Sequence, residues 1–316
     1  MKVVFCGTPH FAVPTLQALY AAGHQVSLVI SQPDRPVGRK QIVEPTAVKQ
    51  AGLALGLPVA QPDKIRNNAE FRSRLEAIAP DAIVVVAYGR ILPAWMLALP
   101  RFGCINLHGS LLPKYRGAAP IQWAVAMGET VTGNTTILLE EGLDTGPILL
   151  QQEVPIGPDQ TAVDLFGSLA ERGAPLMVET LAGLAKGSIQ PKAQDHTEAT
   201  MAPILKREDG HMDFAAHTAT ELRNRWRGFQ PWPGAFALLE GRKLAFTHLL
   251  IAQPPYPNGL SAGRPGEIYF ASGELFLACA HDTWLKVCEL QPEGKRSMTA
   301  GEFWRGARIG AGTRLS

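Results

Sequence analysis

Asn106 and His108 carry the side chains whose types and spacing best suit chemistry in this sequence. They lie two positions apart at the end of the apolar run 104–107, which predicts a buried strand. On an extended backbone both side chains then point to the same face. A side-chain amide can stabilise a developing oxyanion and an imidazole transfers protons near neutral pH, so the pair suits acyl transfer. An Asn-x-His pair taken alone is more often two polar residues at a strand end.

A carboxylate that would complete such a site lies in the segment Gly142-Leu143-Asp144-Thr145-Gly146. Two glycines around one Asp indicate a tight loop that presents the carboxylate, although a lone loop Asp is usually only a turn former. Together with Asn106 and His108, Asp144 is predicted to orient the imidazole and a bound water. These three residues form the predicted catalytic group.

The longer sequence around these residues resembles the folate-dependent formyltransferase family. The resemblance rests on Asn106-x-His108 followed by Ser110-Leu111-Leu112-Pro113 and Arg116-Gly117, and on the loop around Asp144. It extends over essentially the whole chain. It implies that the Asn, the His and the Asp carry formyl transfer, with 10-formyltetrahydrofolate as formyl donor and co-substrate and with no metal.

The resemblance also implies where the folate binds. Backbone groups of residues 87–92 would hold the pterin ring, and a flat heterocycle suits an apolar slot with a few polar backbone groups. Any buried strand that ends in a turn would look similar, so this segment alone is not diagnostic. The predicted folate-binding residues are Tyr88, Gly89, Ile91, Leu92, Ser110, Leu111, Leu112 and Pro113.

A basic segment, residues 32–40, contains three cations, two prolines and a glycine. On composition alone it is equally well a solvated surface loop. It resembles the loop that enters the acceptor stem in family members acting on initiator tRNA, although Gln41 and Ile42 follow where relatives often carry further lysines. Arg35, Arg39 and Lys40 are therefore predicted to bind tRNA.

Continuously apolar strands alternate with helical patterns in the first half of the chain. Strands are predicted at 3–6, 25–31, 81–87, 103–107 and 132–140, and helices at 11–22, 45–55, 67–78 and 161–185. This order indicates a parallel sheet covered by helices on both faces, with ligands at the carboxyl ends of the strands, where His108 lies. Because Pro9 and Ala12 replace two fingerprint glycines, a nicotinamide oxidoreductase is disfavoured.

Beyond residue 206 the pattern changes to short strands separated by Gly and Pro turns. A helix at 219–227 and strands at 235–240, 243–251, 266–269, 275–280 and 284–290 are predicted. They indicate a small all-β barrel, for which the OB fold is the natural candidate. The predicted fold is therefore α/β: a Rossmann-like parallel-sheet formyltransferase domain (1–189), a linker (190–206) and an OB-like C-terminal tRNA-binding domain (207–316). Cations that could face RNA there are Arg223, Arg225, Arg227, Lys295, Arg296, Arg305, Arg308 and Arg314.

Composition is that of an ordinary globular protein. Of the 316 residues 46% are hydrophobic and 18% charged, and the formal net charge of +2 permits a nucleic-acid partner without requiring one. The four cysteines show no CxxC spacing and are interpreted as reduced core residues, not as disulfides or a zinc site. We find neither a signal peptide nor a run of 18 apolar residues, so we expect a cytoplasmic protein with no membrane contact and no obligate protein partner.

The resemblance implies an enzyme that formylates the amino group of methionine on initiator methionyl-tRNA, for translation initiation. One alternative keeps the chemistry but uses a small amine, such as a sugar nucleotide or glycinamide ribonucleotide. Another is a non-catalytic RNA-binding protein on the same fold. The basic loop and the β domain favour tRNA because a small acceptor needs neither, and the intact Asn106, His108 and Asp144 favour an enzyme.

Overall fold

The computed structural model describes residues 1–37, 42–253, 263–307, 309–310 and 312–316. These residues form two compact units, each assembled from segments that are separated in the sequence. The first unit comprises residues 1–120, 131–155 and 164–203, and the second comprises residues 121–130, 156–163 and 204–316.

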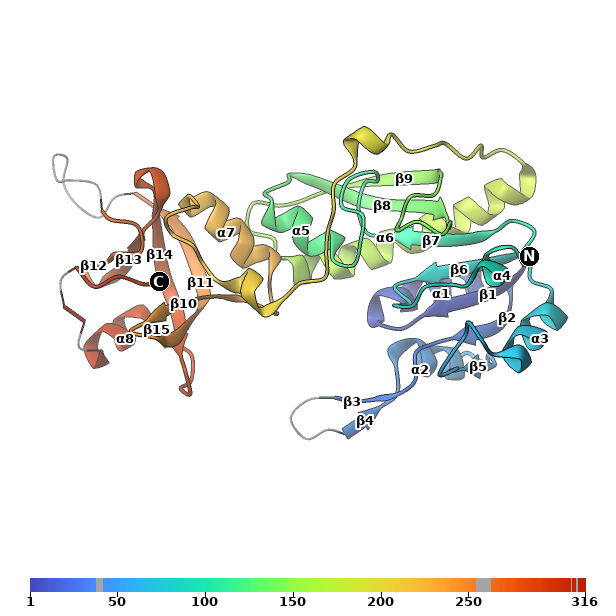
Figure 1. Ribbon diagram of the computed structural model, residues 1–316, viewed down its shortest axis with the longest axis horizontal. Coiled ribbons are helices and arrows are strands. Elements are labelled where there is room, and N and C mark those ends of the chain that lie inside the picture. Colours follow the sequence, from blue (N-terminus) through green and yellow to red (C-terminus); the bar gives the residue numbers. More distant parts are fainter. Residues whose placement is uncertain (38–41, 254–262, 308, 311) are drawn as a thin grey trace. The chain divides into compact units, whose positions relative to one another are not determined.

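The first unit is built on a seven-stranded sheet of order β5-β2-β1-β6-β7-β8-β9 (Figure 1). Its strands are β1 (Lys2–Gly7), β2 (Gln25–Ile30), β5 (Val59–Ala60), β6 (Ala82–Val86), β7 (Cys104–His108), β8 (Val131–Leu138) and β9 (Ile148–Pro155). The pairings from β5 to β7 are parallel, which confirms the predicted Rossmann-like sheet. β8 and β9 are antiparallel to their neighbours. The connection from β8 to β9 is too short for a parallel crossover, so these two strands form a hairpin at the edge.

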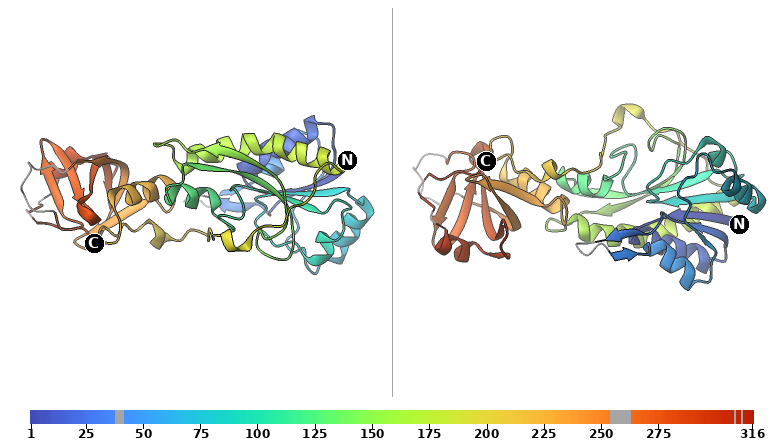
Figure 2. Two further views of the ribbon diagram at one scale, coloured as in Figure 1. Left: turned by 90° about the horizontal axis from the view of Figure 1, so that it is seen from above. Right: turned by 60° about the horizontal axis from the view of Figure 1, so that its bottom comes forward.

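Helices cover both faces of this sheet. Successive side chains of its central strands point to opposite faces and are buried on both, so each face needs a cover. On one face α1 (Val13–Ala21), α2 (Ala47–Ala54) and the long α6 (Ala162–Lys186) pack on residues such as Val3 and Phe5. On the other face α3 (Ala69–Ile78) and α4 (Ala94–Leu97) pack on residues such as Val4 and Cys6 (Figure 2). Because both faces are buried, strands β1 and β6 are apolar at successive positions.

Smaller elements complete the described chain. A separate two-stranded ribbon pairs β3 (Arg35–Val37) with β4 (Ile42–Glu44). Short 3₁₀ helices span His10–Ala12, His196–Glu198, Arg207–Gly210 and Ala280–Asp282. Among the described residues, none of the helices combines the length and apolar character needed to cross a bilayer.

The second unit contains an antiparallel sheet of order β10-β11-β14-β13-β12, with β15 paired to β14. The strands are β10 (Ala235–Leu239), β11 (Arg242–Ala252), β12 (Ile268–Ala271), β13 (Glu274–Ala278), β14 (Trp284–Pro292) and β15 (Met298–Thr299). α7 (Ala219–Gly228) and α8 (Ala300–Gly306) contribute Leu222 and Phe303 to the core of this sheet. The all-β C-terminal region and the helix preceding it, both predicted, are thus confirmed.

Residues 313–316 join the two outer strands of this sheet. Ser316 exchanges two backbone hydrogen bonds with Leu238 of β10, at 2.7 and 3.0 Å. On the other side, Ile268 of β12 donates to Thr313 O (3.0 Å), and Leu315 N donates to Gly266 O (2.8 Å). The side chain of Leu315 is buried in the same core. This last segment therefore closes the sheet into a barrel.

The second unit also includes most of α5 (Pro120–Ala126), because α5 packs tightly on α7. A Cβ atom on Gly228 would lie 2.6 Å from both Ala126 N and Gln122 O, so only glycine permits this approach. Trp123 and Phe229 stack edge to face, with ring centroids 5.3 Å apart. The predicted domain limits treat each domain as one continuous segment. These limits, 1–189, 190–206 and 207–316, stay a prediction.

Candidate active site

His108 is the last residue of β7, at the carboxyl end of the strand, and its side chain is buried. Its Nε2 lies 2.9 Å from the carbonyl oxygen of Tyr115. A carbonyl only accepts, so Nε2 carries a hydrogen and the neutral ring has a bare Nδ1. That Nδ1 lies 3.6 Å from Oδ2 of Asp144. Any second proton on the ring would therefore face a carboxylate.

Asp144 lies in the loop between β8 and β9 and adopts a left-handed backbone conformation with φ of 51°. Its Oδ2 accepts a hydrogen bond of 2.9 Å from the backbone N–H of Gly117. At Gly146 a Cβ atom would lie 1.8 Å from the carbonyl oxygen of Leu138, so this end of the loop requires glycine. The tight loop thus aims the carboxylate at His108, and the structure brings these two residues together.

Asn106 lies two residues before His108 on β7. Its neighbours Ile105 and Leu107 point into the core on the α1 and α6 side, so Asn106 and His108 point to the opposite face. The Asn106 side chain is partly exposed and forms no hydrogen bond with another described residue. Its amide N–H groups are therefore available to an oxyanion, next to the imidazole.

The loop that follows β7 is pinned by the neighbouring hairpin. The hydroxyl of Thr135 donates to Ser110 O (2.6 Å) and accepts from Leu112 N (3.1 Å). Gln151 Nε2 donates to Leu112 O at 2.9 Å. Among the predicted folate-binding residues, Ser110 and Leu112 are buried, whereas Leu111 and Pro113 keep some exposed surface.

The other predicted folate-binding segment, residues 88–92, also contains both buried and exposed side chains. Tyr88 and Leu92 are core residues on the α3 and α4 side, and Gly89 has φ of 79°. The Tyr88 carbonyl oxygen accepts from Thr8 Oγ1 and Gln32 Nε2, at 3.0 and 3.1 Å. Ile91 is 84% exposed and is the side chain in this segment that a ligand can reach most easily.

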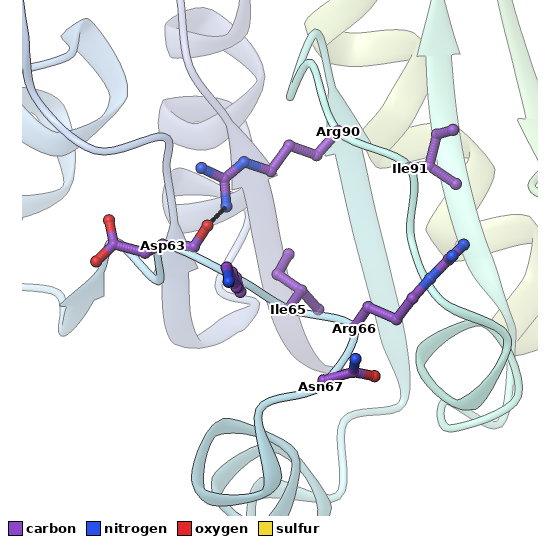
Figure 3. A pocket seen from close by; sticks show the side chains of 7 residues that line it. Asp63, Ile65, Arg66, Asn67, Arg90 and Ile91 are labelled. Carbon is purple, nitrogen blue, oxygen red and sulfur yellow. Dashed lines mark hydrogen bonds between the residues drawn. The ribbon is translucent and has the colours of Figure 1, made fainter.

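A pocket of about 270 Å³ lies beside Ile91 (Figure 3). Its lining residues are Asp63, Lys64, Ile65, Arg66, Asn67, Arg90 and Ile91. Arg90 is fixed because its Nη1 donates to Pro62 O and Asp63 O, both at 2.8 Å. Lys64 and Arg66 are exposed, and neither forms an ion pair with another described residue.

The predicted tRNA-binding residues are only partly described. Arg35 is exposed at the start of β3, and Arg39 and Lys40 lie outside the described residues. Three arginines of α7 that were predicted as possible RNA contacts have partners within the second unit. Arg223 donates to Pro158 O, and Arg225 stacks over Phe229. Arg227 donates to Gly157 O and Gln160 O.

Sequence reasoning gave no role to two buried residues next to the site, Arg116 and Gln194. Arg116 stands in the motif that carried the resemblance, which is a signal that it matters. Gln194 lies in a polar connecting stretch and carries no signal in the sequence. Among the described residues, no group of three or more His, Cys, Asp or Glu residues could hold a metal ion. All four cysteines are free thiols.

Comparison with known proteins shows which family the chain belongs to. Residues 1–181 match the formyl transferase family, and residues 204–308 match the formyl transferase C-terminal domain. The two matches span most of the chain and define it as a formyltransferase. A methionyl-tRNA formyltransferase of Acidobacterium capsulatum is 61% identical over 315 residues, covering 100% of this chain and 99% of that protein. One from Koribacter versatilis is 53% identical, covering 100% and 98%. The chain belongs to the methionyl-tRNA formyltransferase family.

More distant proteins share the fold. The sugar 3N-formyl transferase WlaRD, solved with dTDP and 5-N-formyl-THF, has a TM-score of 0.64 at 17% identity, covering 94% of this chain and 99% of that one. HypX of Aquifex aeolicus, solved with tetrahydrofolic acid, has a TM-score of 0.59 at 16% identity, covering 96% and 46%. At these identities the likeness concerns the fold alone.

Proposed function

We propose that this protein transfers the formyl group of 10-formyltetrahydrofolate to the amino group of methionine on initiator methionyl-tRNA, in the cytoplasm, for translation initiation. The observation that carries the proposal is the meeting of His108 and Asp144 beside the free amide of Asn106. Membership in the methionyl-tRNA formyltransferase family supports the choice of acceptor.

The three side chains have distinct parts in the proposed reaction. The acceptor amine attacks the formyl carbon in its neutral form, and an α-amino group with a reference pKa of about 7.7–8.0 supplies a useful neutral fraction. Attack places negative charge on the formyl oxygen, which the amide of Asn106 stabilises. We assign proton transfer to Nδ1 of His108, because Nε2 is engaged with Tyr115 O. Nδ1 takes the proton that the attacking amine loses and gives it to N10 of the folate, which departs as its bond to the formyl carbon breaks. Asp144 stabilises the imidazolium that forms and fixes its orientation.

The folate is the formyl donor in this proposal, and the residues present suit it. Exposed Ile91 and partly exposed Leu111 and Pro113 offer apolar surface for a flat ring system. The adjoining pocket carries Lys64 and Arg66, whose charges suit the glutamate carboxylates of a folate. Asp63 on the same rim opposes them and limits the net attraction.

For the second unit we propose an OB fold that binds tRNA. The sheet order and the closure through residues 313–316 support a small closed barrel. Arg35, Arg39 and Lys40 are proposed as the tRNA contacts of the first unit. A tRNA is far larger than the site of formyl transfer, so much of its affinity has to come from phosphates contacted elsewhere.

Competition between acceptors tests the proposal. The enzyme is given formyl-labelled 10-formyltetrahydrofolate together with initiator methionyl-tRNA, elongator methionyl-tRNA and an amino-sugar nucleotide. We expect label chiefly on initiator methionyl-tRNA. Preferential labelling of the amino sugar would contradict the proposal and favour the small-amine alternative.

A further inference from the structure

Gln194 is a buried amide whose hydrogen-bonding groups are all used. Its Nε2 donates to the carbonyl oxygens of Asp144 (2.8 Å) and Gly146 (2.7 Å). Its Oε1 accepts from Arg116, at 3.1 Å from Nε and 2.6 Å from Nη2. One side chain thus fastens two points of the loop that presents the Asp144 carboxylate, although Gln194 lies 50 residues away in sequence.

Arg116 forms the other half of this arrangement and is also buried. The residue before it, Tyr115, supplies the carbonyl oxygen that accepts from His108 Nε2. The residue after it, Gly117, supplies the N–H bonded to Asp144 Oδ2. Arg116 therefore lies between the two backbone groups that hold the side chains of His108 and Asp144 in place.

The backbone of Arg116 is itself tied to the stretch that contains Gln194. Its N–H donates to Thr200 O at 2.8 Å, and its carbonyl oxygen accepts from Ala202 N at 2.7 Å. The guanidinium also donates to His196 Nδ1 at 3.1 Å. Among the described residues no carboxylate forms an ion pair with this buried cation, and its hydrogen bonds to Gln194 and His196 offset its lost hydration.

We propose that Arg116 and Gln194 are positioning residues for formyl transfer, and that residues 194–202 belong to the catalytic machinery. The inference rests on the proposed function, because it assigns these residues to the site of that reaction. Asp144 has a left-handed backbone that neighbouring bonds must hold, and its carboxylate lies 3.6 Å from His108. Without the Gln194 amide the loop samples other conformations, and displacements of about 1 Å can cost on the order of 100-fold in rate.

Two variants of Gln194 in the full chain test the proposal. Gln194→Glu keeps the side-chain volume and the contact with Arg116 but removes both N–H donors to the loop. Gln194→Leu removes all four hydrogen bonds. We expect each to lower kcat by roughly 10- to 100-fold, with KM for folate and for tRNA changed by less than about 3-fold. Gln25→Glu is the matched control and should leave kcat unchanged, because Gln25 is exposed at the amino end of β2, whereas His108 lies at the carboxyl end of a parallel strand.

A double-variant cycle separates positioning from general damage to the fold. If Gln194 acts through Asp144, Gln194→Glu should lower kcat no further in an Asp144→Ala background. Multiplicative losses, or a folded Gln194→Glu enzyme with parental kcat, would overturn the inference. Thermal unfolding shows whether each variant is folded at the assay temperature. Failure of the parent to formylate methionyl-tRNA would instead contradict the proposed function, so the two failures are distinguishable.

Discussion

At the scale of single residues, the site depends on how its polar atoms are already engaged. His108 Nε2 donates to a carbonyl and Asp144 Oδ2 accepts from a backbone N–H, whereas the amide of Asn106 has no hydrogen-bond partner in the described part of the chain. The first two side chains are thus held rigidly before substrate arrives. Such preorganisation is what electrostatic stabilisation of a transition state requires.

Removing either side chain on β7 should therefore affect the chemical step. We predict that His108→Ala and Asn106→Ala each lower kcat by about 10²–10⁴, with folate affinity largely retained. Steady-state kinetics with charged tRNA and a folate-binding titration measure the two quantities separately. A folded His108→Ala enzyme that turned over at the parental rate would remove His108 from the mechanism.

The cysteines provide a test of the core that is independent of activity. Burial raises the pKa of Cys104 and Cys279 to about 12 and that of Cys6 well above its usual range. Near neutral pH these thiols are almost wholly protonated, and the thiolate is the reactive form. With a thiol reagent we predict that half-buried Cys288 reacts first in the native protein and that the other three react only after unfolding. Rapid reaction of a second thiol would show that one of these cores is open.

At the scale of elements, the glycines of the loop between β8 and β9 determine the backbone path that presents Asp144. A methyl group on residue 146 would lie 1.8 Å from Leu138 O, which is backbone and cannot move aside easily. We predict that Gly146→Ala displaces the loop, lowers kcat and reduces thermal stability. Gly167→Ala, on α6, is a glycine control in the same unit, since its added methyl group meets nothing within 4 Å and its backbone is helical. Equal kcat for Gly146→Ala and the parent would show that the loop tolerates displacement.

Two of the proposed tRNA contacts of the first unit, Arg39 and Lys40, lie between β3 and β4 in the sequence. We predict that the double variant Arg39→Ala, Lys40→Ala raises KM for charged tRNA several-fold and leaves folate affinity unchanged, because only attraction to phosphates is removed. Kinetics at two salt concentrations measure the effect. If the parent and the double variant respond to tRNA equally at low salt, this segment is ordinary surface.

The sequence predicted the elements well where one short segment determines the outcome. The apolar runs of β1, β6 and β7 require a doubly covered sheet, and the glycines around Asp144 require a tight loop. Gln194 could not be predicted, since its partners Asp144 and Arg116 lie 50 and 78 residues away. Nor could composition separate arginines that bind backbone carbonyls, such as Arg227, from arginines that face solvent.

At the scale of the whole molecule, the cations of the second unit fall into two groups. Arg223 and Arg227 are largely buried against residues 157–160, whereas Lys295 and Arg305 are exposed. We predict that the double variant Lys295→Ala, Arg305→Ala raises KM for tRNA. The slope of log KM against log salt concentration should also fall, by up to about one unit for each phosphate that is no longer neutralised. Arg72→Ala, on α3, removes a charge elsewhere and serves as control. An unchanged salt dependence would place the tRNA contacts of this unit on other residues.

The packing of α5 on α7 has a consequence for synthesis on the ribosome. Ala126 is made roughly 100 residues before Gly228, the residue against which it packs. At about 5–20 residues per second, α5 waits on the order of 5–20 s for its partner helix. Through that interval Trp123 lacks Phe229, the ring against which it packs in the folded protein. The nascent chain therefore exposes one face of α5 throughout that time, and the barrel that completes this unit closes only when residues 313–316 have emerged.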